Sequence, residues 1–341
     1  MVVSFKTIRK LINSFVIIYI MKIVKYIMFF ILMTTIGMLF DRYKKKFLPD
    51  EELDKYNLVR KFLLNESESN NGKPLLWIHS DYEVNARNWE SFYSRNSKQG
   101  NQPYIDLCVE SVIKHCGQSF NICLINDDTF SKLLPKWSIK INGLSNPIKK
   151  HVRTLALCKL LHIYGGMCIP NSLIVMKDLK SLYDEKIKEN CMFVAELLNR
   201  NSSSVYTQFF PSHKIMGCKP KCNEMDIIIS ELEISISNDN TDEKEFNGLL
   251  DRQLYSLVNK NQISLICGKA FGCKDKEENK VLVDDLLIEQ EIKYCLCSLY
   301  GIYLPKNEIL ARTKFNWFVR LNHKQVLESN TQAAKYLLIS L

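Results

Sequence analysis

Fifteen uncharged residues, Tyr26 to Phe40, lie between two basic clusters and precede a long stretch of ordinary globular composition. As a helix this run reaches about 22 Å, short of the roughly 30 Å of hydrocarbon in a bilayer. Extension back to Ile23 includes Lys25, whose ammonium group can reach the headgroup level. No small-residue cleavage site follows, so the sequence predicts an uncleaved membrane anchor with a span over residues 23–40.

A second apolar run, Leu11–Met21, precedes this anchor. The two runs form either one tilted helix or an interfacial segment followed by a span. A buried core helix is the alternative interpretation, and the basic residues that follow Phe40 directly count against it. Lysine and arginine flank the span on both sides, so the positive-inside rule does not decide its orientation.

The formal net charge of +9 is concentrated at the N-terminus. Residues 1–46 hold nine Lys/Arg and one acid, whereas the remaining residues hold 37 basic and 36 acidic side chains. The body is therefore close to neutral, and the composition predicts no nucleic-acid partner. The basic excess flanks the predicted span, which favours a lipid bilayer as the partner of residues 23–40.

All twelve cysteines lie between Cys108 and Cys297. Several occupy apolar periodic positions, as Cys108 and Cys116 do, and such cysteines usually behave as small buried hydrophobic residues. The closely spaced pairs are Cys218/Cys222, Cys267/Cys273 and Cys295/Cys297. None has the two-residue spacing of a zinc knuckle, which disfavours a structural metal site; disulfides stay open if the body is lumenal.

A polar stalk, residues 47–72, separates the anchor segment (residues 1–46) from a folded domain over residues 73–341. The first predicted elements are a buried strand at Leu75–Ile78, a helix over Ile105–Cys116 and a strand at Asn121–Ile125. Gly117 is expected to end the first helix in a left-handed conformation, and Asp128 is expected to cap a short helix after the second strand.

A buried helix over Ile148–Tyr164 stops at a Gly-Gly pair and leads into a predicted strand, Met167–Met176. Further strands are expected near Met192–Glu196 and Lys214–Cys218, and further helices near Glu224–Ile234 and Glu243–Val258. Alternating strands and helices are typical of an open α/β sheet with parallel connections, and we expect the last sixty or so residues to wrap it.

Ligands bind beyond the carboxyl ends of the strands in open α/β sheets. Three segments should therefore converge at one edge: Trp77 to Ser80, Asn126 to Asp128, and Ile169 to Ser172.

The order and spacing of these segments resemble the nucleotide-sugar glycosyltransferases of the GT-A fold, of the DXD sugar-binding and capsular polysaccharide synthesis type. The resemblance rests on a strand ending in His79, a strand ending in Asp127 and Asp128, and a helix running into Tyr164-Gly165-Gly166. It covers roughly residues 73–220. It implies a GT-A-like, Rossmann-like mixed sheet with flanking helices. It also implies a type II, single-pass membrane anchor, in an endomembrane for an enzyme of this kind or, if the viral resemblance described below holds, in a host endomembrane or a virion membrane.

The family's metal-binding Asp-x-Asp is missing at its expected place. Its two aspartates fall at Pro170 and Ser172, and neither residue supplies a carboxylate for Mg²⁺ or Mn²⁺. The family's helix Asp and Arg fall at Thr154 and Leu157, and Arg153 lies next to Thr154 on a different face. The sequence predicts no metal ligands and no cofactor.

If the protein is active, the resemblance implies a hexosyltransferase-like enzyme that transfers a sugar to a glycan acceptor without a bound metal. Positioned cations would then stabilise the leaving diphosphate, and the candidates are Arg153, Lys177, Arg312 and Lys314. The predicted nucleotide-sugar-binding residues are Trp77, His79, Asp127, Asp128, Arg153 and Asn171. Asp251 and Glu196 are the candidate catalytic bases.

Two alternatives need no active site. The first is a catalytically inactive glycosyltransferase fold kept as a binding or structural module, which the rigid backbone of Pro170 favours. The second is a virion or membrane protein without a glycan role. The segments 102–104, 301–305 and 312–318 resemble uncharacterised membrane-anchored proteins of large DNA viruses of protists, a resemblance that implies no activity.

Overall fold

The computed structural model describes residues 72–80, 102–197, 210–238 and 243–341. The predicted anchor, and all but the last residue of the predicted stalk, lie outside these ranges. Within them, no helix combines the length and the apolar character that a membrane crossing requires. The predicted membrane location stays a prediction.

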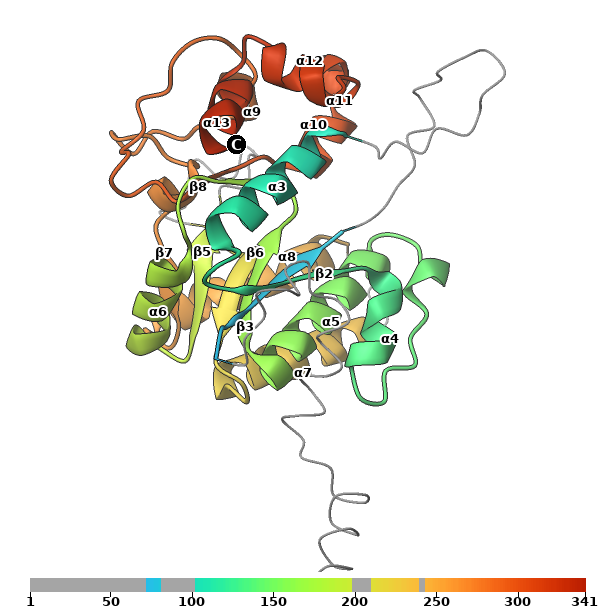
Figure 1. The fold of residues 1–341 in the computed structure, drawn as a ribbon. Helices are drawn as coiled ribbons and strands as arrows, with labels where there is room; N and C mark the ends of the chain where they lie inside the picture. Colours follow the sequence, from blue (N-terminus) through green and yellow to red (C-terminus); the bar gives the residue numbers. More distant parts are fainter. Residues whose placement is uncertain (1–71, 81–101, 198–209, 239–242) are drawn as a thin grey trace, which may run out of the picture. The chain divides into compact units, whose positions relative to one another are not determined.

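A mixed six-stranded sheet forms the centre of the described domain (Figure 1). Its strands are β1 (Leu75–His79), β2 (Asn121–Ile125), β3 (Gly166–Pro170), β5 (Met192–Glu196), β6 (Pro211–Cys218) and β7 (Ser264–Ile266). They lie in the order β2-β1-β3-β6-β5-β7, and only β6 runs antiparallel to its neighbours. The α/β class with a mixed sheet is confirmed. The expected parallel connections hold for five strands, and β6 is the exception.

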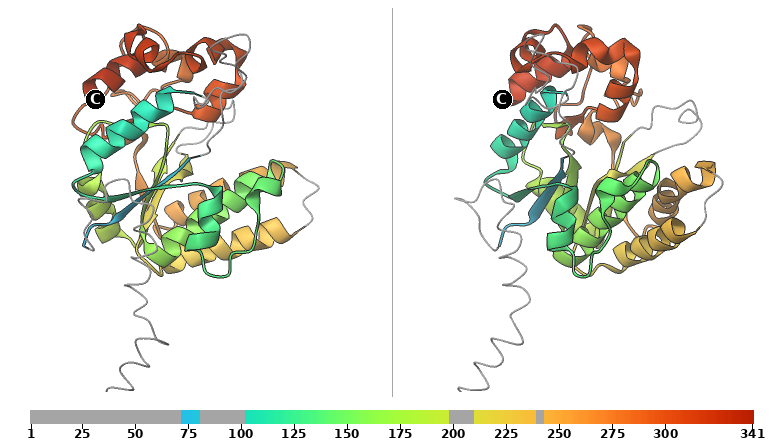
Figure 2. Two further views of the ribbon diagram at one scale, coloured as in Figure 1. Left: turned by 45° about the vertical axis from the view of Figure 1, so that its right-hand side comes forward. Right: turned by 90° about the vertical axis from the view of Figure 1, so that its right-hand side faces the viewer.

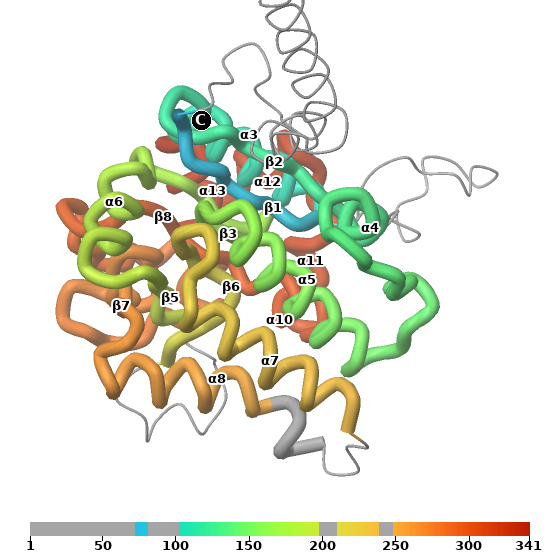
Figure 3. The backbone as a smooth tube through the Cα atoms, turned by 90° about the horizontal axis from the view of Figure 1, so that it is seen from below, coloured from blue at the N-terminus to red at the C-terminus, as the bar shows by residue number. Residues whose placement is uncertain are grey.

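Helices cover both faces of this sheet because side chains alternate along each strand. In β1, Leu76 and Ile78 pack with α3 (Tyr104–Cys116) and α6 (Lys180–Glu189) on one face. Trp77 points to the other face, where the core is completed by α5 (Ile148–Tyr164), α7 (Asn223–Ser237) and α8 (Glu243–Asn259). Figure 3 shows α5, α7 and α8 as neighbouring helices.

The predicted strand Met167–Met176 is wrong as a single element. β3 ends at Pro170, and the chain then enters β4 (Leu173–Val175), which pairs antiparallel with β8 (Gly301–Tyr303) in a separate two-stranded sheet. The backbone of Ser172 is held by the chain that follows β8: Leu304 N donates to its carbonyl oxygen over 3.0 Å, and its Oγ donates to Leu304 O over 2.5 Å. These bonds turn the chain away from the main sheet.

The C-terminal helices are α9 (Val283–Leu286), α10 (Lys306–Ala311), α11 (Asn316–Val319), α12 (His323–Glu328) and α13 (Gln332–Ser340). Figure 2 shows these helices, coloured red, beside α3. Their apolar residues form a third core with α3, β4 and β8. They wrap α3 and the small sheet rather than a face of the six-stranded sheet.

Two expected helix signals are wrong. Gly117 has φ −61° and stays right-handed, with its N–H donating to Ile113 O. Asn126, not Asp128, caps the turn after β2, because its side chain accepts a hydrogen bond from Thr129 N. The left-handed region is used instead at Gly166, with φ +98°, where a Cβ would lie 2.2 Å from Leu75 O. Only glycine fits that close approach.

Candidate functional site

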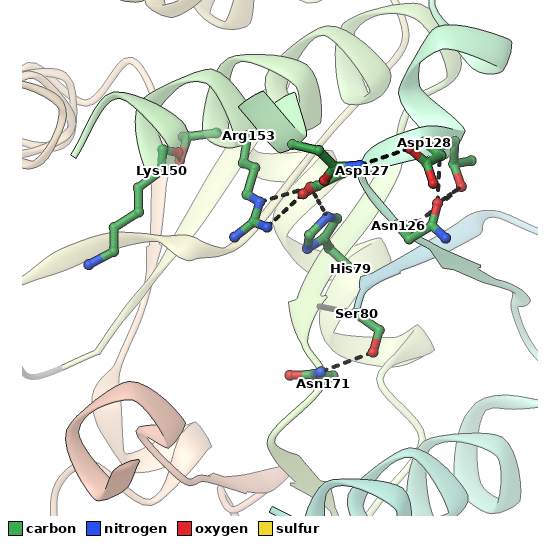
Figure 4. A network of polar contacts seen from close by, with 11 residues as sticks. His79, Ser80, Asn126, Asp127, Asp128, Lys150, Arg153 and Asn171 are labelled. Atoms are coloured by element: carbon green, nitrogen blue, oxygen red, sulfur yellow. Dashed lines mark hydrogen bonds and ion pairs between the residues drawn. The ribbon is translucent and has the colours of Figure 1, made fainter. Parts of the chain in front are cut away.

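The carboxyl ends of three parallel strands meet at one edge of the sheet, as the sequence predicts. His79 of β1 lies in register with Ile125 of β2 and with Pro170 of β3. Ser80 N donates to Ile125 O over 2.9 Å, and Asn171 Nδ2 lies 3.5 Å from Ser80 Oγ. Figure 4 shows the polar side chains that gather at this edge, here called the carboxyl-edge site: His79, Ser80, Asp127, Arg153 and Asn171.

Asp127 is the hub of this site. Arg153 donates from Nε to Oδ1 over 2.8 Å and from Nη2 to Oδ2 over 2.6 Å, a bidentate pairing. His79 Nε2 donates to the same Oδ1 over 3.0 Å. The side chains of His79 and Asp127 are about nine-tenths buried, and that of Arg153 is 20% exposed. Three residues predicted from the sequence are thus brought into direct contact.

Local structure explains this geometry. The capped turn after β2 directs Asp127 toward β1, and Phe130 stacks on the His79 ring with centroids 5.5 Å apart and planes 5° apart. Arg153 projects from α5 to the carboxyl edge, where its guanidinium meets the Asp127 carboxylate. Burial alone would raise the pKa of Asp127, but hydrogen bonds from His79 and Arg153, with the Arg153 charge, lower it well below its usual value. The carboxyl group is therefore an anion that orients both partners.

Asn171 lies between Pro170 and Ser172, the positions at which the sequence resemblance would place an Asp-x-Asp. It is 3% exposed, and its only described hydrogen bond is the long one to Ser80, so no described group donates to its Oδ1. An unpaired buried amide oxygen costs about 1–3 kcal/mol. A ligand hydroxyl would satisfy it, so this atom points to a ligand rather than to a finished core.

The flanking positions, Pro170 and Ser172, carry no carboxylate. Pro170 ends β3, and Ser172 is fully buried with its hydroxyl donated to Leu304 O. The residues at these two positions therefore do not fit a divalent metal of the Asp-x-Asp kind.

Sequence reasoning missed Lys214 as a site candidate. Lys214 lies in β6, the neighbour of β3, beyond Met216 in the direction of the carboxyl end of β3. Its Nζ donates to Tyr303 Oη over 2.9 Å and lies 5.4 Å from the centre of that ring. The available signal was a lysine directly before the apolar residues Ile215 and Met216 of a predicted strand.

Two predicted binding residues lie apart from the carboxyl-edge site. Trp77 is fully buried, and its indole N–H donates to Gly165 O over 3.0 Å, so no face of the ring is open to a sugar or base. That predicted role is wrong because the alternation of β1 turns Trp77 into the core. Asp128 is exposed and accepts a hydrogen bond from Asn142 over 3.2 Å.

Glu196 ends β5 at the same edge of the sheet, but its surroundings are those of a structural ion pair. It is 2% exposed; Lys274 Nζ lies 2.6 Å from Oε1, and Gly268 N donates to Oε2 over 3.0 Å. An acceptor hydroxyl has no access to this carboxylate, which argues against its predicted role as a base.

Asp251 stays a candidate. It is 44% exposed on α8, and its Oδ1 lies 3.6 Å from Nδ1 of His213 on β6. This aspartate–histidine pair is the one described arrangement in which a predicted base is both exposed and near a second titratable group.

Of the four candidate cations, only Arg153 reaches the carboxyl-edge site. Lys177 Nζ donates to the carbonyl oxygens of Leu296 and Cys297. Arg312 pairs with Glu308, and Lys314 pairs with Asp284, both in the C-terminal part of the domain.

Comparison with models of known protein families, with curated protein sequences and with solved structures gave no match to this chain. The fold and the site by themselves define an α/β protein with a mixed sheet and a polar site at the carboxyl ends of its first three strands.

Proposed function

We propose that this chain is a membrane-anchored, glycosyltransferase-like protein of the GT-A type. We further propose that it binds a nucleotide-sugar at the carboxyl-edge site without an Asp-x-Asp metal. The mixed sheet with flanking helices agrees with what the sequence resemblance implies. The observation that carries the proposal is Asn171, a buried amide whose oxygen no described group satisfies, one residue past the end of β3.

The site offers complementary groups for such a ligand. A sugar or ribose hydroxyl donates to Asn171 Oδ1, and Ser80 adds a hydroxyl beside it. The exposed Lys150, one turn before Arg153 on α5, supplies positive charge near the first turn of a helix, where the dipole also favours anions. Fixed cations aimed at a diphosphate can take over part of the role of a metal.

The second candidate function is binding without sugar transfer. It is favoured by Glu196, whose charge is neutralised by Lys274 in a buried pair, and by Pro170, which removes a backbone donor at the end of β3. Asp251 is then the remaining candidate base, and its exposure is compatible with either function.

The test is a thermal-unfolding panel on the full chain in detergent, with UDP-, GDP- and CMP-sugars in EDTA or in Mn²⁺. A ligand of the native state raises the unfolding temperature by mass action. We expect a shift with one nucleotide-sugar in EDTA, which Asn171→Ala removes and which Asn142→Ala, an exposed asparagine, leaves intact.

No shift with any sugar contradicts the proposed function and favours a structural protein. A shift that appears only with Mn²⁺ contradicts the metal-free part of the proposal. When a shift is seen, release of free sugar or product from the same nucleotide-sugar separates transfer from binding. Loss of that turnover in Asp251→Asn, with the thermal shift retained, would assign the base.

A further inference from the structure

A second cluster of polar side chains lies at the opposite end of the main sheet. Cys191 immediately precedes β5, and Cys222 is the N-cap residue of α7, which carries Glu224 in its first turn. Their ligand atoms, two thiol sulfurs and a carboxylate oxygen, all lie within 4.8 Å of one another. Cys191 and Cys222 are 31 residues apart in the chain, so the fold, and not a short motif, assembles this set.

The backbone explains why these residues meet. Met192 of β5 pairs with Cys218, the last residue of β6, and Gly166 pairs with the same Cys218, so the cluster lies at the amino end of β3. Lys219 N donates to Cys191 O over 3.0 Å, which fastens the turn between β6 and α7 to the start of β5.

The side chains already interact with one another. Cys222 Sγ donates to Glu224 Oε2 over 3.0 Å, and Cys218, a fourth neighbour, directs its thiol to Leu161 O over 3.4 Å. Cys222 is 1% exposed, whereas Cys191 and Glu224 are partly exposed, so an ion has a route from solvent. No described lysine or arginine forms an ion pair with Glu224.

We propose that Cys191, Cys222 and Glu224 bind one zinc ion. Thiolate sulfur and carboxylate oxygen are both zinc ligands, and thiolates select zinc over the hard cations calcium and magnesium. Zinc is four-coordinate in protein sites, and the fourth position is taken by water or by Cys218 after its thiol turns away from Leu161. The absence of a zinc-knuckle spacing excludes a short metal motif but does not bear on ligands from two distant segments.

The bound ion would stabilise the domain. It would join the start of β5 to the β6–α7 turn, two segments otherwise held here by hydrogen bonds. Because the unfolded chain loses this arrangement, zinc binding adds to the free energy of unfolding by mass action.

The experiment is a zinc titration of the full chain in detergent, stripped with EDTA and kept reduced with a phosphine reductant. A chromogenic chelator competes for zinc, and Cd²⁺ in place of zinc reports thiolate ligation through its ultraviolet charge-transfer absorption. We expect one ion per chain. Cys191→Ser and Cys222→Ser should lose it, and Glu224→Gln should weaken the affinity by about tenfold or more.

Cys297→Ser is the matched control, because Cys297 is an exposed free cysteine elsewhere in the domain. It should bind zinc as the unaltered chain does. Glu224→Gln serves as the test if a cysteine variant fails to fold. Glu224 is partly exposed, so this variant should fold, and thermal unfolding in EDTA checks that it does. The proposal is overturned if the reduced chain binds no stoichiometric zinc, or if the three cluster variants bind zinc as tightly as Cys297→Ser.

Discussion

The two ends of the main sheet carry polar clusters of opposite electrostatic character. At the carboxyl edge, Asp127 already has its countercharge in Arg153, with His79 as a second donor, and its pKa is lowered. At the amino end, Cys222 and Glu224 face each other and Cys191, and the pKa of Cys222 is raised. The first cluster contains its own countercharge, whereas no described lysine or arginine forms an ion pair with Glu224 in the second.

This difference suggests different ligands. A charge-balanced cluster that leaves one neutral amide oxygen unsatisfied suits a neutral hydroxyl donor with an attached anion, such as a nucleotide-sugar. A cluster of crowded acidic groups suits a cation. At the carboxyl edge the described residues lack a hydrogen-bond donor for Asn171 Oδ1, and at the amino end they lack a positively charged ion-pair partner for Glu224.

Glu196→Gln should cause the largest loss in the free energy of unfolding. It tests whether the second acidic group at the carboxyl edge is also neutralised by a partner within the protein. The change leaves Lys274 with its charge buried and unpaired, so we expect a loss of about 3–5 kcal/mol in the free energy of unfolding. Urea unfolding of the full chain in detergent measures it. Combining it with Lys274→Met should restore most of the loss.

The matched control for this prediction is Glu189→Gln, which removes the exposed partner of Lys186. Exposed pairs contribute little, so its effect should be small. Equal effects from the two glutamates would show that the Glu196 pair is not a structural element. Glu196 would then return as a candidate base.

Asp127→Asn should have an intermediate effect, because it removes the charge that holds Arg153 and His79 but retains the side-chain volume. We expect a loss of about 2 kcal/mol at neutral pH and loss of the nucleotide-sugar thermal shift. The exposed neighbour Asp128→Asn is the control and should change neither quantity.

The pH dependence of the Asp127→Asn effect has a defined sign. A lowered pKa means that the folded state binds this proton more weakly than the unfolded state does. The stability from Asp127 is therefore fully present above the unfolded pKa of about 4 and is lost as the pH falls below it. The difference between the two proteins should shrink on acidification, and a difference that grows would contradict the assignment.

The smallest expected effect is the coupling between the two ends. Zinc and the nucleotide-sugar should raise the free energy of unfolding additively, within about 0.5 kcal/mol, because their sites share no residue and lie at opposite ends of β3. Thermal unfolding with each ligand alone and with both measures this. A larger coupling would show that the two sites are not independent.

Local pattern predicted the elements that carry the carboxyl-edge site. The apolar runs at β1 and β2, the buried helix α5 and the Gly-Gly turn all appear where periodicity places them. The rule that ligands lie beyond the carboxyl ends of strands then brought His79, Asp127 and Asn171 to one edge. These predictions worked because each depends on residues close together in the chain.

Predictions failed where they depended on the direction in which a side chain points or on which distant residue it contacts. The turn of Trp77 into the core, the Lys274 partner of Glu196, and the departure of the chain from the main sheet after Pro170 each depend on contacts with distant segments. No spacing along the chain encodes them.

The sequence by itself determined the α/β class, the polar ends of the first strands and the absence of carboxylates at Pro170 and Ser172. It also located the apolar N-terminal segment. Only the tertiary structure decided that Arg153 pairs with Asp127, that Asn171 is left unsatisfied, and that Cys191 meets Cys222 and Glu224. The physical reason is that periodicity is a local property of the chain, whereas charge balance, burial and ligand sets arise where segments far apart in sequence are packed together.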